Sequence, residues 1–341
     1  MIKRTSAPAV LIAAVLSLVA LPAAAAPPAA PELFRSLPAG DALVTIDGAA
    51  LFGKMLPTLL ASRPDTAKRV DAQLARWRDD FGVDLRQARQ VALSASLFEG
   101  TEREWVAAVD GAFDAVAAPG ALAARLETFV KRETRFAVRS ESREGVAIYV
   151  LPEKEADGRV REEQAVAILD ARTALVGTPT AVRRAVDARK GKAPSAADTA
   201  TLVDAWSQSA ATSPVRFGLL VEPLIKAEMA RDPNNPFLKS VAGARFMFGT
   251  AGLTPDGGLA LAVTTRTNTP QDARNVLGTL QAFVELGKQL TADKPDLAAL
   301  LDLVRLDAAG NDVLLTATVP AGKLDQIIRL VDKSQPMVAR R

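Results

Sequence analysis

The chain has 341 residues, of which 49% are hydrophobic but only 5% aromatic, so its core must be built mostly from Ala, Val and Leu. Its formal charge is +3, and it contains no Cys and no His. These absences exclude disulfides, thiolate nucleophiles, Cys/His zinc sites and a Ser-His-Asp triad within the chain.

Residues 1–26 have the pattern of a bacterial secretory signal peptide. Two basic residues precede the apolar run Val10–Ala20, and small residues then offer a cleavage site after Ala25 or Ala26. The apolar run is short for a membrane span, and no later segment approaches about 18 uncharged apolar residues. We therefore expect a soluble mature chain, periplasmic or secreted, with no transmembrane segment after signal cleavage.

The mature chain is nearly neutral, because two of the basic residues belong to the leader. The run Arg132–Arg143 comes closest to a basic patch, and glutamates interrupt it. Proteins that bind nucleic acids usually carry a basic patch or stripe. We therefore expect no nucleic-acid partner.

The first lobe is expected over residues 41–212, after a flexible linker at 27–40 that is rich in Pro and Ala. Its first strand is Ala42–Asp47. Two helices follow, and the second of them, Thr66–Phe81, should end at Gly82, a typical helix stop. Strand pairs and further helices complete the lobe.

The clearest local pattern is Ala165–Lys190, AVAILDARTALVGTPTAVRRAVDARK. It predicts a strand, a tight turn, a second strand and then a helix opened by Pro179, since proline suits the first helical position. Thr178 is placed to cap this helix with its hydroxyl. Thr269-Pro270 opens a longer helix in the same way. The predicted buried face of that helix is Ala273, Val276, Leu277, Leu280, Phe283 and Val284.

The second lobe is expected over residues 213–333, and 334–341 should form a loose tail. Hairpins are predicted at 245–266 and 304–319, where strong turn signals separate strand-like runs, and proline-started helices follow them. The two lobes share the skeleton β-α-ββ-α-ββ-α. This indicates internal duplication, unless proline is simply common at strand-to-helix junctions.

These elements predict an α+β fold with two similar lobes of antiparallel β-hairpins and helices packed on one sheet face. In Val91–Leu97, Leu259–Arg266 and Val313–Val319, one face is bulky and the other is small and weakly polar. In the plain interpretation the small faces meet solvent. The sharper hypothesis is a shallow groove for an acyl chain or an extended peptide. The candidate groove residues are Ser94, Ser96, Thr264, Thr316 and Thr318.

We find no pattern of catalytic, cofactor-binding or metal-ligating residues. The sequence has neither a Gly-rich phosphate loop nor a nucleophile elbow. Asp232–Pro236 and Asp256–Gly258 lack the alternating oxygen ligands of an EF-hand and predict turns. A serine with a lysine base is conceivable as a hydrolytic pair, but no signature supports it.

Three phrases resemble a loose group of exported bacterial proteins of unknown function: SLPAGDALVTIDGAALF, DFGVDLRQARQVALS and ALVGTPTAVRRAVDA. The group has a Leu-Pro-Ala-Asp opening before a strand, and repeated hairpin-helix units. This chain departs from that opening, because Gly40 precedes Asp41. The resemblance implies structure only and brings no catalytic residues.

The sequence favours a non-enzymatic periplasmic binding or interaction protein whose partner is an envelope protein, a peptide or a lipid. One alternative is a hydrolase with an unconventional, His-free site. The lack of His removes the commonest general base near neutral pH without excluding an enzyme. A further alternative is a structural envelope protein that pairs through its sheet edges.

Overall fold

The computed structural model of the chain describes residues 31–97, 104–113, 121–133, 138–154, 160–291 and 295–324. The predicted signal peptide and C-terminal tail lie outside these residues. The chain forms two compact units. The N-terminal unit holds the described residues up to Ser207 together with Phe217–Leu220, and the C-terminal unit holds Gln208–Arg216 and the residues from Val221. The boundary predicted near residue 212 lies inside Gln208–Arg216.

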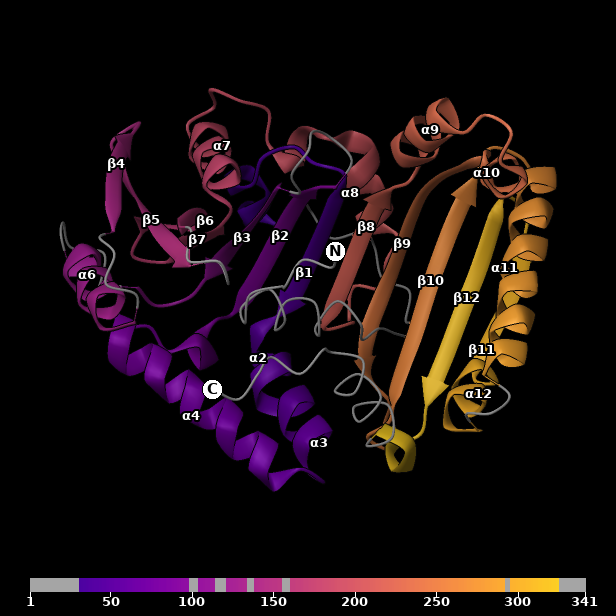
Figure 1. Ribbon diagram of the computed structural model, residues 1–341, viewed down its shortest axis with the longest axis horizontal. Coiled ribbons are helices and arrows are strands. Elements are labelled where there is room, and N and C mark those ends of the chain that lie inside the picture. Colours follow the sequence, from indigo (N-terminus) through magenta and orange to yellow (C-terminus); the bar gives the residue numbers. More distant parts are fainter. Residues whose placement is uncertain are drawn as a thin grey trace. The chain divides into compact units, whose positions relative to one another are not determined.

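Eight strands of the described residues contribute to the sheet of the N-terminal unit, in the spatial order β8-β1-β2-β3-β7-β6-β5-β4 (Figure 1). Neighbouring strands from β1 to β4 are antiparallel. Only the last four residues of β8 belong to this unit. The strands are β1 (Ala42–Asp47), β2 (Gln90–Ser96), β3 (Glu104–Asp110), β4 (Arg139–Arg143), β5 (Val146–Lys154), β6 (Val160–Asp170), β7 (Thr173–Gly177) and β8 (Val215–Leu220).

The helical segments of this unit include short 3-10 turns and one π-helical stretch, η2. They are η1 (Glu32–Ser36), α2 (Gly48–Ala50), η2 (Leu51–Met55), α3 (Leu56–Leu60), α4 (Pro64–Phe81), η3 (Leu85–Gln87), α6 (Ala121–Glu133), α7 (Pro179–Arg189), η4 (Ala196–Asp198) and α8 (Ala200–Ser207). Gly82 ends α4 as predicted, with a φ of 73°. Glycine adopts this left-handed conformation without the penalty that a Cβ would bring.

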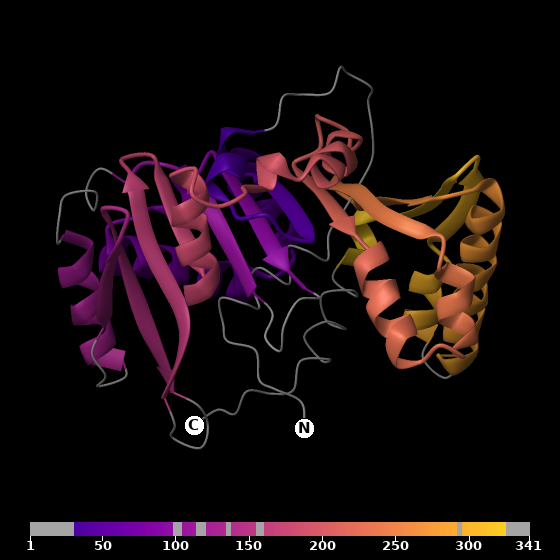
Figure 2. The ribbon, with the colours of Figure 1, turned by 90° about the horizontal axis from the view of Figure 1, so that it is seen from above.

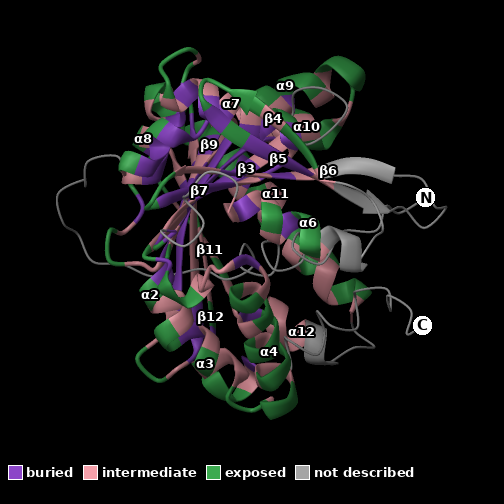
Figure 3. Ribbon diagram, turned by 90° about the vertical axis from the view of Figure 1, so that its left-hand side faces the viewer, coloured by how far each residue is buried: buried purple, intermediate pink, exposed green. Residues whose placement is uncertain are grey.

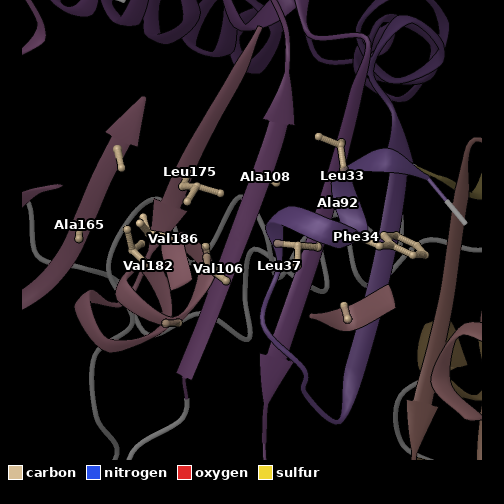
Figure 4. Packing of buried hydrophobic residues seen from close by; sticks show 14 of the residues in the cluster. Leu33, Phe34, Leu37, Ala92, Val106, Ala108, Ala165, Leu175, Val182 and Val186 are labelled. Carbon is tan, nitrogen blue, oxygen red and sulfur yellow. The ribbon is translucent and has the colours of Figure 1, made fainter. Parts of the chain in front are cut away.

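Helices cover both faces of the sheet in the N-terminal unit. Successive side chains of a strand point to opposite faces, and the neighbours Ala174 and Leu175 of β7 are both buried. Leu175 packs in one core with Val182 of α7 (Figure 4). Ala174 belongs to a second core with Phe81 of α4 and Leu126 of α6. In Figure 3 the strands near β3 and β7 are accordingly purple, whereas α4 is largely green and pink.

Residues 31–40 belong to the core, although their Pro and Ala content predicted a flexible linker. Leu33, Phe34 and Leu37, in and next to η1, are buried among the strands of this unit (Figure 4). The ring of Phe34 meets Trp206 edge-on, with centroids 5.0 Å apart. The apolar area that these side chains bury offsets the conformational entropy lost on ordering the segment.

The predicted strand–turn–strand–helix unit at 165–190 is confirmed as β6, β7 and α7. Pro179 lies in the first turn of α7, as expected. Thr178, however, makes no side-chain cap. Its Oγ1 instead accepts a hydrogen bond from Trp105 N at 3.3 Å and donates one to Trp105 O at 3.4 Å. The Thr178 hydroxyl therefore bonds to the neighbouring strand β3 and not, as the local sequence had predicted, to the N-terminus of α7.

The C-terminal unit has the strand order β9-β10-β12-β11, and all of these neighbours are antiparallel. The hairpins predicted at 245–266 and 304–319 are confirmed as β9–β10 and β11–β12, while most of the helix expected after Pro320 lies outside the described residues. The elements are α9 (Glu222–Arg231), α10 (Pro236–Val241), β9 (Ala244–Leu253), β10 (Leu259–Thr267), α11 (Pro270–Leu290), α12 (Pro295–Leu301), β11 (Val304–Ala309), β12 (Asp312–Val319) and η5 (Ala321–Lys323).

The α+β class with antiparallel hairpins in two lobes is confirmed. In the C-terminal unit α11 lies at the β11–β12 end of the sheet, and the orange helices lie on one side of the strands in the view from above (Figures 1 and 2). This matches the expected packing on one face. The N-terminal unit differs because its strands are apolar on both faces, so helices cover both.

Candidate binding surface

The two serines of the predicted groove are buried in the N-terminal unit. Ser94 and Ser96 lie on β2, and only 1% and 7% of their surfaces are exposed. Ser94 Oγ donates a hydrogen bond to Pro38 O at 2.9 Å. Ser94 lies on the same face of β2 as Ala92, which packs in the core with α7 and α8. These small side chains therefore provide room for helices rather than an open groove.

The three threonines of the predicted groove lie together on one face of the C-terminal sheet. Thr316 and Thr318 of β12 are opposite Ala262 and Ala260 of β10, and Thr264 follows on the same face. Thr318 is exposed and the other two are half-buried. The structure thus brings the threonines to one face and places the two serines in the other unit.

A different surface of the C-terminal unit is hollowed, between α10 and α11. Both helices have capped N-termini. Asn235 Oδ1 accepts hydrogen bonds from Phe237 N at 3.1 Å and from Leu238 N at 3.4 Å. Thr269 Oγ1 accepts from Asp272 N at 3.1 Å, which is an N-cap of the preferred kind. These caps fix where each helix begins and hence which side chains face the hollow.

One polar contact and one close backbone approach hold the helices at this spacing. Thr279 Oγ1 of α11 lies 2.8 Å from Ser240 Oγ of α10, within hydrogen-bonding distance. Gly243 permits the close approach of α11, because a Cβ at that position would lie 2.2 Å from Asp272 Cγ. The spacing of α10 and α11 is therefore set by a hydroxyl contact and a close backbone approach, together with a ring contact between Phe237 and Phe283.

Large apolar side chains are exposed on this surface. Of the five exposed large hydrophobic side chains among the described residues, Phe237, Phe283, Leu286 and Leu290 belong to α10 and α11. The rings of Phe237 and Phe283 meet edge-on with centroids 5.1 Å apart, and Leu290 is 70% exposed. Monomeric proteins rarely expose clustered apolar side chains without a functional reason.

The hollow is an open groove of about 770 Å³. Its polar residues come from the N-terminal half of α11 and from α10, and its apolar residues follow toward the end of α11. The lining consists of Phe237, Lys239, Ser240, Arg274, Asn275, Gly278, Thr279, Ala282, Phe283 and Leu286. We call this set, with Leu290, the α10–α11 groove.

The charged residues of the groove lining are both cationic. Lys239 and Arg274 contribute them, and the lining contains no Asp or Glu. Arg274 donates hydrogen bonds to Gln271 Oε1 from Nε at 3.2 Å and from Nη2 at 2.6 Å. A neutral amide thus orients the guanidinium and leaves its charge uncompensated. Arg274 therefore presents positive charge in the first half of α11 and Lys239 on α10, while Phe283 and Leu286 present apolar surface in the second half of α11.

Phe283 was predicted to face the sheet, and the structure places it outward instead. Ala273 and Val276 of the predicted face are buried, and Leu277, Leu280 and Val284 are half-buried. At about 100° per residue, Phe283 lies roughly a quarter turn from Ala273 and about 20° from the buried Val276, so it is at the edge of the predicted face. Phe283, Leu286 and Leu290 are spaced by three and four residues, so a second apolar stripe was present in the sequence. That spacing is the signal that could have identified this surface.

Comparisons with known proteins identify distant structural likenesses only. No family model and no curated protein matches the chain. Crystal form III of TP0453 aligns with a TM-score of 0.44 at 12% identity, over 88% of this chain and 98% of that one. Crystal form I aligns with a TM-score of 0.44 at 11% identity, over 89% and 98%. Likenesses this remote say nothing about ligand or activity.

A second hollow, of about 360 Å³, lies in the N-terminal unit and is lined by Gln87, Arg89, Gly111, Ala112, Ala171 and Arg172. Asp110 Oδ1 accepts a hydrogen bond from Arg89 Nη2 at 2.5 Å and lies 3.6 Å from Arg172 Nη2. This carboxylate offsets the nearby positive charge. Within the described ranges, no three carboxylates come close enough to hold a metal ion.

Arg216 of β8 is a buried cation that no sequence pattern indicated, and it is only 6% exposed. Burial lowers the pKa of its guanidinium to about 10, because a charged group loses hydration in the interior. At neutral pH the side chain is still protonated, so it is not a candidate general base. Among the helices described, none has the length and apolar run needed to cross a membrane.

Proposed function

We propose that this chain is an exported, non-enzymatic binding protein and that the α10–α11 groove is its ligand-binding surface. One observation carries the proposal: three of the four large exposed apolar side chains of α10 and α11, Phe237, Phe283 and Leu286, line one open groove. A ligand that covers them removes apolar area from water, which stabilises a complex by about 25 cal/mol per Å². The caps at both helix N-termini favour a preformed surface, which lowers the entropic cost of binding.

The groove favours a ligand with an apolar body and an anionic end. Lys239 and Arg274 would pair with the anion, while Phe283, Leu286 and Leu290 would cover the apolar part. An acyl chain with a carboxylate has this chemistry, and so does an amphipathic segment of an envelope protein or peptide with acidic residues. We therefore keep the ligands expected from the sequence, which are an envelope protein, a peptide or a lipid. The proposed binding site is now the α10–α11 groove instead of the sheet face.

The chemistry of the lining favours binding over catalysis. The chain has no Cys and no His, and the groove lining has no carboxylate that could act as a general base. The leader-like pattern at 1–26, and the resemblance to exported bacterial proteins, support export to the periplasm or the medium.

The proposal is tested by filling the groove at Gly278. A Cβ at this position would meet nothing within 4 Å, so Gly278→Leu introduces a bulky side chain at the groove with open space at its point of attachment. Leucine is also the better helix former by roughly 0.8 kcal/mol, so the variant should be at least as stable as the parent. We expect a dansylated undecanoic acid, or an acidic amphipathic peptide, to bind the parent at least tenfold more tightly than the variant.

The matched control is Gly53→Leu. Gly53 is also a helical glycine with open space around its Cβ position, but it belongs to the N-terminal unit. This control should bind the probes like the parent. Titrations monitored by dansyl fluorescence and by calorimetry measure both variants. If neither probe saturates the parent below about 1 mM, or if Gly278→Leu binds as well as Gly53→Leu, the groove is not the binding surface.

A further inference from the structure

Strand β11 lies at the edge of the C-terminal sheet and is paired on one side only. It forms an antiparallel ladder with β12, and no other strand of the described residues pairs with it. Its six residues, Val304–Ala309, contain no Pro and no Lys, and the ladder with β12 has no bulge. Exposed sheet edges are often protected by a proline, a lysine or a β-bulge. β11 lacks these three protections and carries only its charged side chains, Arg305 and Asp307, at the edge.

The hairpin geometry shows which backbone groups of β11 point outward. A two-residue turn, Gly310-Asn311, joins β11 to β12, and Gly310 has a φ of 59° as a type II′ turn requires. Ala309 and Asp312 flank this turn and form the closing hydrogen-bonded pair. Hydrogen-bonded and non-hydrogen-bonded pairs then alternate along an antiparallel ladder. The N–H and C=O groups of Val304, Leu306 and Ala308 consequently face the open edge. Side chains of the same strand hold two of them, since Val304 O accepts from Arg305 Nη1 at 3.3 Å and Ala308 N donates to Asp307 Oδ1 at 2.7 Å.

We propose that β11 pairs antiparallel with β11 of a second copy of this chain, about a two-fold axis at Leu306. In that register Leu306 lies opposite its own copy and Val304 lies opposite Ala308. Arg305 lies opposite Asp307 twice, once on each side of the axis. The outward backbone groups of one copy then meet those of the other in hydrogen-bonded pairs. Arg305 and Asp307 occupy the intervening non-hydrogen-bonded positions, where facing side chains are closest.

The charged pair is available for such contacts. Arg305 and Asp307 are both exposed. Arg305 donates from Nη1 to Asp302 O at 2.6 Å and to Val304 O at 3.3 Å, which orients the side chain and leaves its other nitrogens for a carboxylate. Asp307 Oδ1 accepts from Ala308 N at 2.7 Å. Pairing exchanges this bond for one from Ala308 N to the second copy, and the carboxylate then faces the guanidinium of the second copy's Arg305. Opposite charges that face each other across a strand pair favour this register over a shifted one.

The edge strand of the N-terminal unit, β4, has charges that oppose self-pairing. β4 is the last strand of the N-terminal sheet, and the same kind of self-pairing about Glu141 would place Arg139 opposite Arg143. Like charges would face each other at every charged position, which opposes pairing. Two of these side chains are also held by α7, since Arg143 bonds to Asp187 and Glu141 to Arg183. Of the two edges, only β11 is complementary to itself.

The interface should be reversible. Pairing of two six-residue edges buries less than the roughly 1,200–2,000 Å² typical of stable interfaces. Sedimentation velocity of the full mature chain should therefore show a monomer at low micromolar concentration and a growing dimer fraction toward millimolar concentration. A chain that sediments as a monomer across this range would overturn the proposal.

Charge exchange tests the register. Arg305→Asp places two aspartates opposite two aspartates, and Asp307→Arg places arginines opposite arginines, so each variant alone should dimerise at least tenfold more weakly. An equimolar mixture of the two restores every opposite-charge pair and should dimerise like the parent, as should the double exchange. The matched control, Arg139→Asp on β4, should leave the parent's dimer unchanged.

A backbone test is independent of charge. Ala308→Pro removes an outward N–H whose only bond in the structure is to the exposed Asp307 Oδ1, and it removes no hydrogen bond to β12. The hairpin should therefore keep its thermal transition while the dimer is lost. The register is wrong if the parent dimerises and the mixture of single variants does not regain that affinity. Edge pairing is wrong if Ala308→Pro keeps the native thermal transition and dimerises like the parent. Neither result concerns the α10–α11 groove, whose ligand binding is measured separately.

Discussion

Helices α7 and α11 begin with the same local signal but meet different environments. Each follows a hairpin, and each has a Thr-Pro step at its start. The 11-residue α7 buries six residues, whereas the 21-residue α11 buries only two. The Thr-Pro step thus marks where a helix starts and says nothing about how much of it is covered.

The strands beneath the two helices explain the difference. Under α7 the sheet presents small, fully buried side chains such as Ala165 and Ala167. A Cβ at Gly177 would lie 2.2 Å from Trp105 O, so the backbones pack closely at that point. Under α11 the sheet presents larger residues such as Leu261 and Leu315, which are only half-buried. The first helix completes a core, and the second leaves one flank open.

The surroundings of α7 and α11 should differ most in how much the free energy of unfolding falls when a leucine is replaced by alanine. Leu175 beneath α7 is fully buried, so Leu175→Ala should lower the free energy of unfolding by about 2–5 kcal/mol. Leu286 on α11 is 47% exposed, so Leu286→Ala should change it by less than about 0.5 kcal/mol. Urea denaturation measures both.

Two probes keep the units apart in this experiment. All three tryptophans, Trp77, Trp105 and Trp206, lie in the N-terminal unit, so fluorescence reports its unfolding. Far-UV circular dichroism reports the whole chain. A loss for Leu286→Ala as large as that for Leu175→Ala would mean that α11 is covered in solution, and the comparison drawn above would fail.

The sequence predicted the positions of helices and strands better than the burial of their side chains. Hydrophobic alternation and turn residues placed the hairpins, and Pro179 and Pro270 placed the helix starts, because these signals act within a few residues. Burial depends on partners far along the chain. Phe34 was missed as a core residue because its partner Trp206 is distant in sequence, and Ser94 was taken as open for the same reason. Internal duplication stays a hypothesis.

Helices α7 and α11 also differ in how their N-termini are capped. Thr269 Oγ1 accepts the hydrogen bond from Asp272 N and so caps α11. Thr178 Oγ1 instead bonds to the backbone of Trp105. Thr269→Ala should therefore destabilise by about 1 kcal/mol, and hydrogen exchange should increase at the first turn of α11.

The matched change at the other helix should have a different signature. Thr178→Ala removes long contacts to β3 at 3.3 and 3.4 Å, so faster exchange is expected at Trp105 and not at the start of α7. Hydrogen exchange resolved by mass spectrometry distinguishes the two patterns. Equal acceleration at both helix starts would show that Thr178 caps α7 after all.

The smallest predicted effect concerns the ion pairs that attach α7 to β4. The hydrogen bonds from Arg143 hold the pKa of Asp187 below its ordinary value, and those from Arg183 do the same for the pKa of Glu141. A carboxyl group whose pKa is lower in the folded state stabilises the fold above its unfolded-state pKa. This contribution is lost as the pH falls through the folded-state pKa.

Asp187→Asn should therefore reduce stability at pH 7 by less than about 1 kcal/mol, since Arg143 is partly exposed and solvent screens the pair. The difference from the parent should shrink once the pH falls below the ordinary carboxyl range and vanish when Asp187 itself is protonated. Glu285→Gln is the matched control on α11, where the carboxylate contacts Lys288 at an exposed position. It should change little at either pH. Thermal melts between neutral and acidic pH measure both, and a penalty for Asp187→Asn that stays constant with pH would indicate a packing role instead of a charge role.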